Sequence, residues 1–202
     1  MKAPNRHVRR DEIMDIAVEI LAERGYRDAS MLEVAKRASA SKETLYAWFG
    51  TKAGLFEAII RRNALTVQSV LAHHLEGDGP SDHALRDFGR ALLELLLGNS
   101  AVAINRAAIS EAHTDPALAQ TLASAGRDAT LPAFVRFLER QRERRALTFD
   151  NASDAAEDFL GLLLGDMQVR RLLGVVPAPD VNANKARAAR AAKTFLKMYE
   201  AA

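Results

Sequence analysis

Two helix-capping serines, Ser30 and Ser41, set narrow limits on how this 202-residue chain can fold. Ser30 begins a capping box, because Glu33 follows at the position from which a carboxylate can accept a hydrogen bond from the serine's backbone N–H. Ser41 can cap a second short helix, because its hydroxyl can accept from the free backbone N–H groups of the first turn. Only Ser39 and Ala40 separate the two helices, so the sequence predicts a helix-turn-helix.

The second helix of this motif, expected over residues 42–49, carries the side chains of a DNA-reading helix. Leu45 and Phe49 stand four residues apart and can face a core, and Gly50 can adopt the left-handed conformation that ends a helix. The remaining positions are mostly polar or aromatic, and such side chains contact phosphates, sugars and base edges. A surface helix whose aromatic side chains pack on a neighbour explains the same residues, so this stretch alone leaves both interpretations open.

Positive charge is concentrated at the N-terminal end of the chain. The formal net charge is only +2, but residues 1–62 hold 12 Lys and Arg against 9 Asp and Glu, which gives +3. Residues 63–202 hold 16 against 17, which gives −1. The first residues include Arg9 and Arg10 and form a basic arm of the kind that lies on a nucleic-acid backbone. A solvated tail is the alternative interpretation of this arm.

Helical periodicity continues along the rest of the chain. Apolar residues recur at spacings of three and four over about residues 9–24, and Gly25 then ends this first helix. A long fourth helix is expected over residues 52–75. Later helices include one over about 155–173 and a last one over about 181–200. No run alternates with period two, so the chain is predicted to be all-α.

The predicted architecture is a three-helix DNA-binding domain in residues 1–52 and a larger helical-bundle domain in residues 53–202, linked by the fourth helix. The absence of cysteine excludes disulfides and thiolate metal sites, and it suits a cytoplasmic protein. Apolar runs are too short to span a membrane. His73 and His74 are adjacent and point to different sides of a helix, and no glycine-rich phosphate loop is present. We expect no enzyme activity, no metal and no cofactor.

Residues from about 13 to 60 resemble the TetR family of bacterial transcriptional regulators. The resemblance implies a homodimer whose first three helices bind DNA. It also implies a helical second domain that binds a small-molecule effector and thereby releases the DNA. The residues that carry the resemblance are Gly25-Tyr26, Ser30, the helix through Val34-Ala35, and above all the stretch from Ser41 to Lys52.

Two departures from the family pattern affect the motif. Ser39 and Ala40 stand in a turn that often holds glycine and a bulky apolar residue, so the turn either avoids a positive φ or tolerates one at a cost of roughly 1 kcal/mol. Trp48 stands where a smaller aromatic residue or histidine is frequent, so it contacts DNA or wedges against the first helix. Lys42 and Thr44 are expected to reach bases. Phosphate contacts are expected from Arg9, Arg10, Ser30 and Lys52, and the further DNA contacts from Ser41, Lys42, Thr44, Tyr46 and Trp48.

One short reading helix buries too little surface for specific affinity, so such modules work in pairs on a near-palindromic site. We therefore expect a homodimer in which the last two helices of each chain form a four-helix interface. The alternative is that the same apolar stripes are buried within one chain. The residues expected at the interface are Gly161, Gly165, Val181, Ala188, Ala192, Phe195 and Tyr199.

The predicted function is repression of transcription: the dimer binds a double-stranded DNA operator and leaves it when a small-molecule effector binds. A helical dimer that binds a ligand or a protein partner without reading an operator is the alternative. The expected effector pocket lies in the apolar interior of the second domain, although the same residues also suit a plain core. The pocket residues are Phe88, Leu92, Arg106, Ile109, Glu111, His113, Phe134, Phe137 and Met167.

Overall fold

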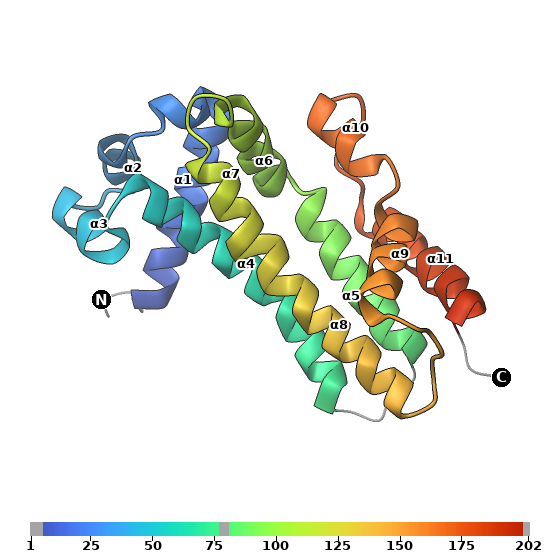
Figure 1. Ribbon diagram of the computed structural model, residues 1–202. Coiled ribbons are helices and arrows are strands. Elements are labelled where there is room, and N and C mark those ends of the chain that lie inside the picture. The colour runs from blue at the N-terminus through green and yellow to red at the C-terminus, as the bar shows by residue number, and fades with distance from the viewer. Residues whose placement is uncertain (1–5, 77–80, 200–202) are drawn as a thin grey trace. The chain divides into compact units, whose positions relative to one another are not determined.

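The computed structural model describes residues 6–76 and 81–199 (Figure 1). Every regular element in these residues is a helix, which confirms the predicted all-α class. No single helix in the described part of the chain is long and apolar enough to cross a membrane, and only α5 (Ser81–Leu96) and α6 (Asn99–Glu111), taken together as a bent pair, have the length and composition of a membrane span. The helices are α1 (Arg6–Asp28), α2 (Met31–Arg37), α3 (Lys42–Phe49), α4 (Lys52–Glu76), α5 (Ser81–Leu96), α6 (Asn99–Glu111), α7 (Ala117–Leu122), the π-helical turn η1 (Ala123–Arg127), α8 (Asp128–Glu143), α9 (Ala152–Leu164), α10 (Met167–Leu173) and α11 (Val181–Tyr199).

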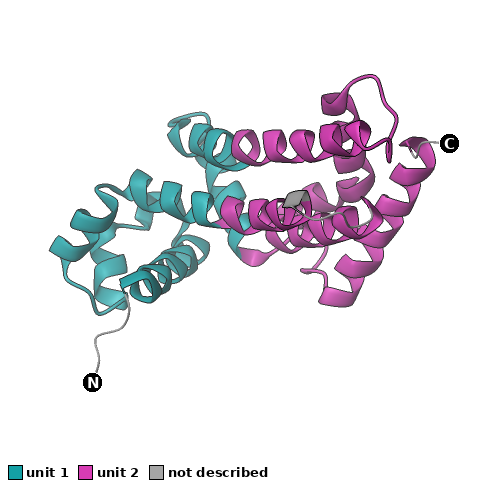
Figure 2. Ribbon diagram, turned by 90° about the horizontal axis from the view of Figure 1, so that it is seen from below, with its two compact units in different colours: residues 1–62, 100–126 teal, residues 63–99, 127–202 magenta. Residues whose placement is uncertain are grey.

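The chain packs as two compact units, which Figure 2 shows in different colours. Unit 1 comprises residues 1–62 and 100–126, and unit 2 comprises residues 63–99 and 127–202. This division differs from the boundary at residue 52 that the motif suggested, because apolar side chains of α6 and α7 complete the core around α1 to α4. These side chains are Ile104, Ala107, Ala108 and Leu118.

The core of unit 1 holds the helix-turn-helix in place. Ile13 and Ile20 of α1 are fully buried together with Leu45 of α3. Gly25 interrupts α1 with φ 77 and ψ 173, a conformation that glycine adopts without the strain of a Cβ atom. The predicted stop at Gly25 is therefore a break, after which the chain continues for one more turn. Tyr26 follows it and packs on a buried phenylalanine of α4, Phe56, with ring centroids 5.3 Å apart.

The core of unit 2 is built around phenylalanine rings from four helices. Phe88 of α5 stacks on Phe134 of α8 with ring centroids 4.3 Å apart. Phe159 of α9 lies 5.2 Å from Phe134 and 5.4 Å from Phe195 of α11. All four rings are fully buried. Aromatic pairs at these distances stabilise a core beyond the apolar area that they bury.

The helix predicted over residues 155–173 is two helices, α9 and α10. Gly165 takes φ 49 at the end of α9, and its N–H donates to the Gly161 carbonyl at 2.9 Å. The Arg187 guanidinium of α11 donates to the carbonyls of Leu163 and Leu164, at 2.5 and 2.8 Å, and so closes the same helix end. The apolar pattern did not reveal this break because it continues through the glycine on both sides.

Candidate nucleic-acid interface

α3 is fixed at both ends by the residues that the sequence predicted. Ser41 adopts an extended backbone, and its Oγ accepts a hydrogen bond from the Thr44 N–H at 3.0 Å. The same Oγ lies 2.9 Å from Thr44 Oγ1, which orients the threonine hydroxyl. Gly50 follows the helix with φ 71, and its N–H donates to the Tyr46 carbonyl at 2.9 Å. The predicted cap and stop of this helix are confirmed.

The outer face of α3 presents polar and aromatic side chains to solvent. Leu45 and Phe49 are buried in unit 1, whereas Lys42 and Tyr46 are exposed. Lys42 Nζ lies 5.7 Å from the centre of the Tyr46 ring, within the range of a cation–π contact. A cation and a phenol therefore stand side by side on the face that is free to meet a ligand. An exposed carboxylate, Glu43, stands next to them in the first turn.

Trp48 packs against the first helix. The indole is half-buried, and its ring lies 6.4 Å from Phe49 in an edge-on arrangement. The Arg6 guanidinium lies 5.7 Å from the centre of the Trp48 ring, and the Arg10 guanidinium lies 5.1 Å from the Phe49 ring. Two cation–π contacts thus dock the start of α1 on the end of α3. The first residues of the basic arm lie outside the described residues.

Arg6 is a contact that the sequence interpretation missed. The first helix was expected to begin near residue 9, whereas α1 begins at Arg6. Arg6 and Arg10 are four residues apart, so once the helix includes both they project from the same face. The spacing of four between Arg6 and Arg10 could have predicted that both side chains contact the same neighbouring helix.

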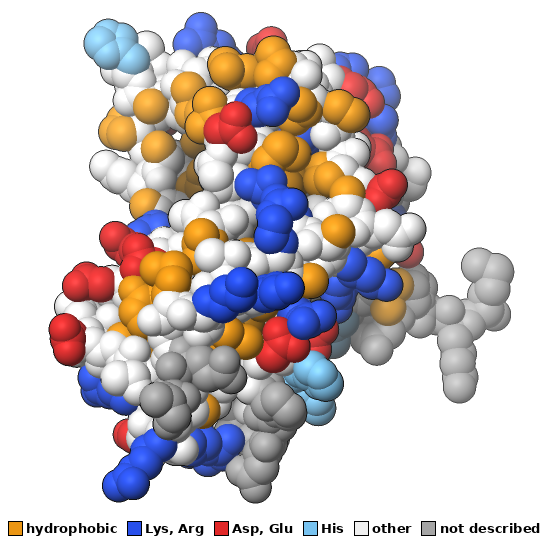
Figure 3. Space-filling view, turned by 90° about the vertical axis from the view of Figure 1, so that its right-hand side faces the viewer, with side chains coloured by type: hydrophobic (Ala, Val, Ile, Leu, Met, Phe, Trp, Pro, Cys, Tyr) orange, Lys and Arg blue, Asp and Glu red, His pale blue; other side chains and the backbone are white. Residues whose placement is uncertain are grey.

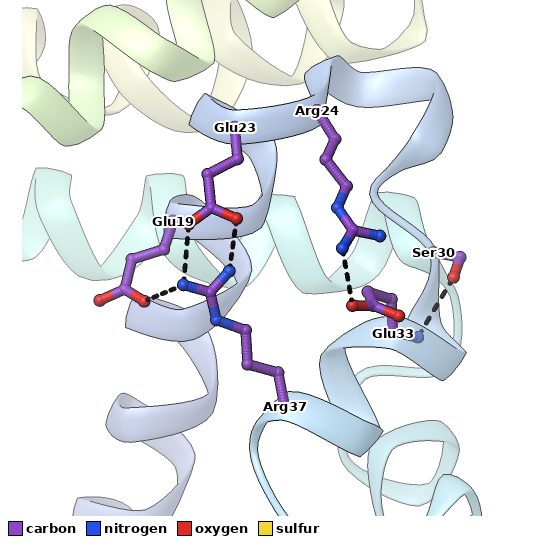
Figure 4. A network of polar contacts seen from close by, with 6 residues as sticks. All are labelled: Glu19, Glu23, Arg24, Ser30, Glu33 and Arg37. Atoms are coloured by element: carbon purple, nitrogen blue, oxygen red, sulfur yellow. Dashed lines mark hydrogen bonds and ion pairs between the residues drawn. The ribbon is translucent and has the colours of Figure 1, made fainter.

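Ion pairs join α2 to α1 (Figure 4). Nη1 and Nη2 of Arg37 lie 2.6 and 2.8 Å from the two carboxylate oxygens of Glu23, and Nη2 lies 3.3 Å from Glu19 Oε2. The hydrogen bonds from Arg37 hold the pKa of Glu23 below its ordinary value. These contacts orient α2 against α1 but contribute little to the free energy of unfolding, because solvent screens exposed ion pairs.

Ser30 caps α2 as predicted, but the rest of the capping box is different. Ser30 Oγ accepts from the Glu33 N–H at 3.2 Å. The return bond was expected to join the Glu33 carboxylate to the Ser30 N–H. That N–H donates to the Asp28 carbonyl instead, at 2.9 Å, and the Glu33 carboxylate lies 3.2 Å from Arg24 Nη2 (Figure 4). The turn that follows the break in α1 brings the Asp28 carbonyl within reach and so frees Glu33 for the ion pair.

Arg9 contacts protein carbonyls. Its Nη2 donates to the Ala38 carbonyl and lies 3.4 Å from the Ser39 carbonyl, and its Nη1 lies 2.6 Å from Glu12 Oε2. Ala38 and Ser39 belong to the turn between α2 and α3. The phosphate contact expected from Arg9 stays a prediction, and the guanidinium has partners within unit 1.

Lys52 likewise contacts the protein. Its Nζ donates to the Tyr26 carbonyl at 2.7 Å and lies 4.1 Å from the centre of the Tyr26 ring. Burial lowers the pKa of Lys52, against the opposite influence of nearby carboxylates, of which Glu111 has the largest effect. The ammonium therefore lies against the partial negative charge of the carbonyl groups at the end of α1, where a cation is favourable. Its predicted phosphate contact also stays a prediction.

The residues predicted to line an effector pocket are divided between the two units. In unit 1, Ile109 is 64% exposed and Glu111 Oε2 lies 3.7 Å from Arg27. The members in unit 2 lie in its apolar core or pack against it. The unit 1 members are Arg106, Ile109, Glu111 and His113, and the unit 2 members are Phe88, Leu92, Phe134, Phe137 and Met167.

The structure corrects part of the predicted dimer interface. Ala188, Ala192 and Phe195 of α11 are 1% exposed or less, and they lie in the core of unit 2 with side chains of α5 and α9. Side chains buried in this way offer no surface to a second chain. The apolar stripe of α11 showed which residues share a face, but it did not show whether that face meets the same chain or another one.

The other predicted interface residues have different surroundings. Gly161 and Val181 are exposed, and a Cβ atom at Gly161 would meet open space. Gly165 closes α9, and the Tyr199 hydroxyl donates a hydrogen bond to Asp158 Oδ2. That bond raises the pKa of Tyr199 to about 12.

Unit 2 exposes apolar and basic side chains that the sequence interpretation did not single out. Val169 and Leu173 of α10 and Val175 after it are 57%, 71% and 64% exposed. α11 carries five lysines and arginines and no acidic residue. Figure 3, which faces the side of α10 and α11 in Figure 1, shows Lys and Arg side chains gathered among hydrophobic ones. These features belong to the part of unit 2 in which an interface was predicted.

Two family models match this chain. Residues 13–59 match the model described as "Bacterial regulatory proteins, tetR family". Residues 83–201 match the model described as "AefR-like transcriptional repressor, C-terminal domain". The first match covers the helix-turn-helix of unit 1, and the second covers more than half of the chain.

The chain is also similar to individual transcriptional regulators, in sequence and in structure. An uncharacterised HTH-type transcriptional regulator of Bacillus subtilis, YvkB, is 27% identical over 165 residues, which cover 80% of this chain and 82% of that protein. A TetR transcriptional regulator from Agrobacterium tumefaciens is 32% identical, with a TM-score of 0.73 over 98% of this chain and 96% of that chain. The flavonoid-responsive regulator FrrA is 31% identical, with a TM-score of 0.66 over 96% of this chain and 98% of that chain.

Proposed function

Because the chain belongs to the TetR family of DNA-binding transcriptional regulators, we propose that it is a repressor that binds a near-palindromic operator as a homodimer and leaves it when a small-molecule effector binds. The observation that carries the choice of repression is the match of residues 83–201 to a repressor domain. The exposed face of α3 supports operator reading, because Lys42 and Tyr46 stand there without a core role.

Lys42 and Thr44 are the proposed base contacts. A lysine can donate to guanine O6 and N7, and a threonine can contribute a hydroxyl or a methyl contact in the major groove. The Ser41 Oγ, 2.9 Å from Thr44 Oγ1, would hold the threonine in one orientation as α3 enters the groove. α3 has only eight residues, so we assign specificity to two copies in successive major grooves, about 34 Å apart.

The proposed dimer surface lies on the exposed parts of α9 to α11. Gly161 has open space above it and would let a helix of the second chain approach closely. Val169, Leu173 and Val181 are exposed and would be buried by that approach. This surface replaces Ala188, Ala192 and Phe195 of α11, which are buried within unit 2.

Flavonoids are the first effector class to test, because a flavonoid-responsive regulator is 31% identical to this chain over 96% of its length. Unit 2 provides ring faces for a planar aromatic compound in the cluster of Phe88, Phe134 and Phe159. These rings are buried, so a ligand would have to open the core between α5 and α8 or α9. We therefore expect slow binding and a large stabilisation of unit 2 once the ligand is bound.

Genomic footprinting in the source bacterium tests operator reading directly. The proposal predicts protected near-palindromic sites, with transcription from the adjacent promoters rising when the gene for this protein is deleted. Falling transcription at those promoters would make the protein an activator, as the name of one relative, the transcriptional activator FasR, describes. An absence of protected sites would favour the alternative, a ligand- or partner-binding protein that does not read an operator.

A mobility shift on such a site, with quercetin or naringenin as the added flavonoid, tests the effector. The expected result is release of the DNA at concentrations that also raise the thermal midpoint of the free protein. If a full set of flavonoids changes neither DNA binding nor the thermal midpoint, flavonoids are excluded as effectors, and the proposal that the protein reads an operator still stands.

A further inference from the structure

The turn between α2 and α3 has a serine, Ser39, at a position past a helix end where glycine is usual. The Ser39 N–H donates to the Lys36 carbonyl at 3.1 Å, and the Ala40 N–H donates to the Ala35 carbonyl at 2.9 Å. This pair of bonds defines a Schellman motif, in which the first residue past the helix end takes a left-handed backbone. Ser39 has φ 49, so a side chain occupies a conformation that strains every residue with a Cβ atom. Other contacts must therefore hold the turn.

Arg9 makes those contacts from α1. Its Nη2 donates to the Ala38 carbonyl and lies 3.4 Å from the Ser39 carbonyl, so one guanidinium faces two successive carbonyls of the turn. Carbonyls at a helix C-terminus carry partial negative charge, and a charged donor is favourable there. Glu12, three residues along α1, holds the other side of the guanidinium through the 2.6 Å contact with Nη1. The Arg9 side chain is only 28% exposed.

We propose that Arg9 is a positioning residue for operator reading: it holds Ser39 in the left-handed conformation and so fixes the direction in which α3 leaves α2. Its effect on DNA rests on the proposed function, whereas its effect on the turn does not. Without Arg9 the turn samples other conformations, and only the fraction with the correct turn can bind. A dimer would lose that fraction at each of its two half-sites.

The salt dependence of binding separates this role from a phosphate contact. A lysine or arginine that neutralises a phosphate releases counterions, so its loss lowers the slope of log affinity against log salt by about 1 per contact. A residue that only holds a turn leaves that slope unchanged. Replacing Ser39 by glycine tests whether Arg9 acts through the turn. Glycine adopts the left-handed conformation without a strained Cβ atom, so a turn with glycine should not need the contacts from Arg9.

The test uses the full chain and four variants, Arg9→Gln, Ser39→Gly, the double variant Arg9→Gln/Ser39→Gly, and the control Arg61→Gln. Arg61 pairs with Glu57 on the surface of α4 and is 61% exposed, so its replacement removes a charge from unit 1 without touching the turn. The probe is a duplex selected from a random pool by the wild-type protein. We expect Arg9→Gln to bind roughly thirtyfold more weakly, on the scale of one strained residue at each of the two half-sites, with an unchanged salt slope. The double variant should recover most of that loss, and Ser39→Gly and Arg61→Gln should bind like the wild type.

Amide hydrogen exchange provides a readout without DNA. Arg9→Gln should speed exchange at Ser39 and Ala40, whose N–H groups donate within the turn, and the double variant should slow it again. If Arg9→Gln alone does not fold, folding of the double variant supports the proposal and its failure to fold contradicts it.

Three results would overturn the role of Arg9. A lower salt slope with no recovery in the double variant would make Arg9 a phosphate contact. Lost affinity with an unchanged slope but no recovery would show that Arg9 acts elsewhere than through Ser39. Unchanged exchange at Ser39 and Ala40 in Arg9→Gln would show that the turn does not need Arg9. If the wild-type protein selects no duplex, operator reading fails, and the exchange result still decides the role of Arg9.

Discussion

Lys52→Met removes the ammonium of Lys52 while keeping a side chain of similar length at the start of α4. The ammonium donates to the Tyr26 carbonyl at 2.7 Å and lies 4.1 Å from the centre of the Tyr26 ring. Methionine can fill the same space but can neither donate to the carbonyl nor attract the ring as a cation. The variant therefore isolates what the charge contributes to the end of α1.

The expected loss follows from these two contacts. A hydrogen bond from a charged group contributes about 1.5 to 3 kcal/mol, and a partly exposed cation–π contact about 0.5 to 1 kcal/mol. Burial lowers the pKa of Lys52, so part of this gain already offsets the desolvation of the ammonium. We expect a net loss of about 2 kcal/mol, which corresponds to a thermal midpoint lower by about 4 to 8 °C for a chain of this size.

Thermal unfolding at equal protomer concentration, combined with operator binding at several salt concentrations, measures both possible roles of Lys52. The structural role predicts a lower midpoint and an unchanged salt slope for the fraction that stays folded. An unchanged midpoint with a slope that falls by about 1 per subunit would refute this reasoning, because it would make Lys52 a phosphate contact that does not support α1.

Three further outcomes are expected. Tyr46→Ala should weaken operator binding at least tenfold in a mobility shift and leave the thermal midpoint unchanged, because Tyr46 is exposed on α3. Equal binding by the variant and the wild type at matched salt would show that Tyr46 does not contact the operator. Tyr199→Phe should abolish the tyrosine ionisation near pH 12 in an ultraviolet titration. Because the folded pKa of Tyr199 is raised, the stability from its bond to Asp158 should be present below about pH 10 and lost as the pH rises through about 12, and a wild-type titration without this late step would contradict the assignment. Leu173→Glu should shift the chain toward monomer in light scattering if the exposed side of α10 lies in the dimer surface, and an unchanged mass would place the interface elsewhere.

Local features of unit 1 were predictable from the sequence because they depend on neighbouring residues. Ser30 and Ser41 cap the helices that they precede, and Gly50 ends α3 with a positive φ. Leu45 and Phe49 face the core, as their spacing of four predicted. In each of these cases the cause lies within about one helical turn of the residue, so no knowledge of distant segments was needed.

The partners of Arg9 and Lys52 were not predictable, because they depend on where distant segments meet. Arg9 reaches carbonyls about thirty residues further along the chain, and Lys52 reaches the end of α1. A basic side chain near a DNA-reading helix is read as a phosphate contact when only its charge is known. The structure adds the carbonyl groups that compete for the same charge.

The apolar stripe of α11 shows a second limit of sequence reasoning. Ala188, Ala192 and Phe195 share one face, as predicted, but that face is buried within unit 2. Periodicity identifies a face that needs to be covered and does not identify what covers it. The division of residues 155–173 into α9 and α10 was missed for a related reason, because the apolar pattern does not register the positive φ of Gly165.

Selection of binding sites from a pool of random DNA duplexes tests the central claim, that the outer face of α3 reads an operator sequence. The full-length wild-type protein should enrich a near-palindrome whose half-sites lie one helical turn apart. Lys42→Ala/Tyr46→Ala, a variant of two exposed residues that leaves the core of unit 1 intact, should enrich none. Enrichment of the same palindrome by this variant, or of no sequence by the wild type, would contradict the claim.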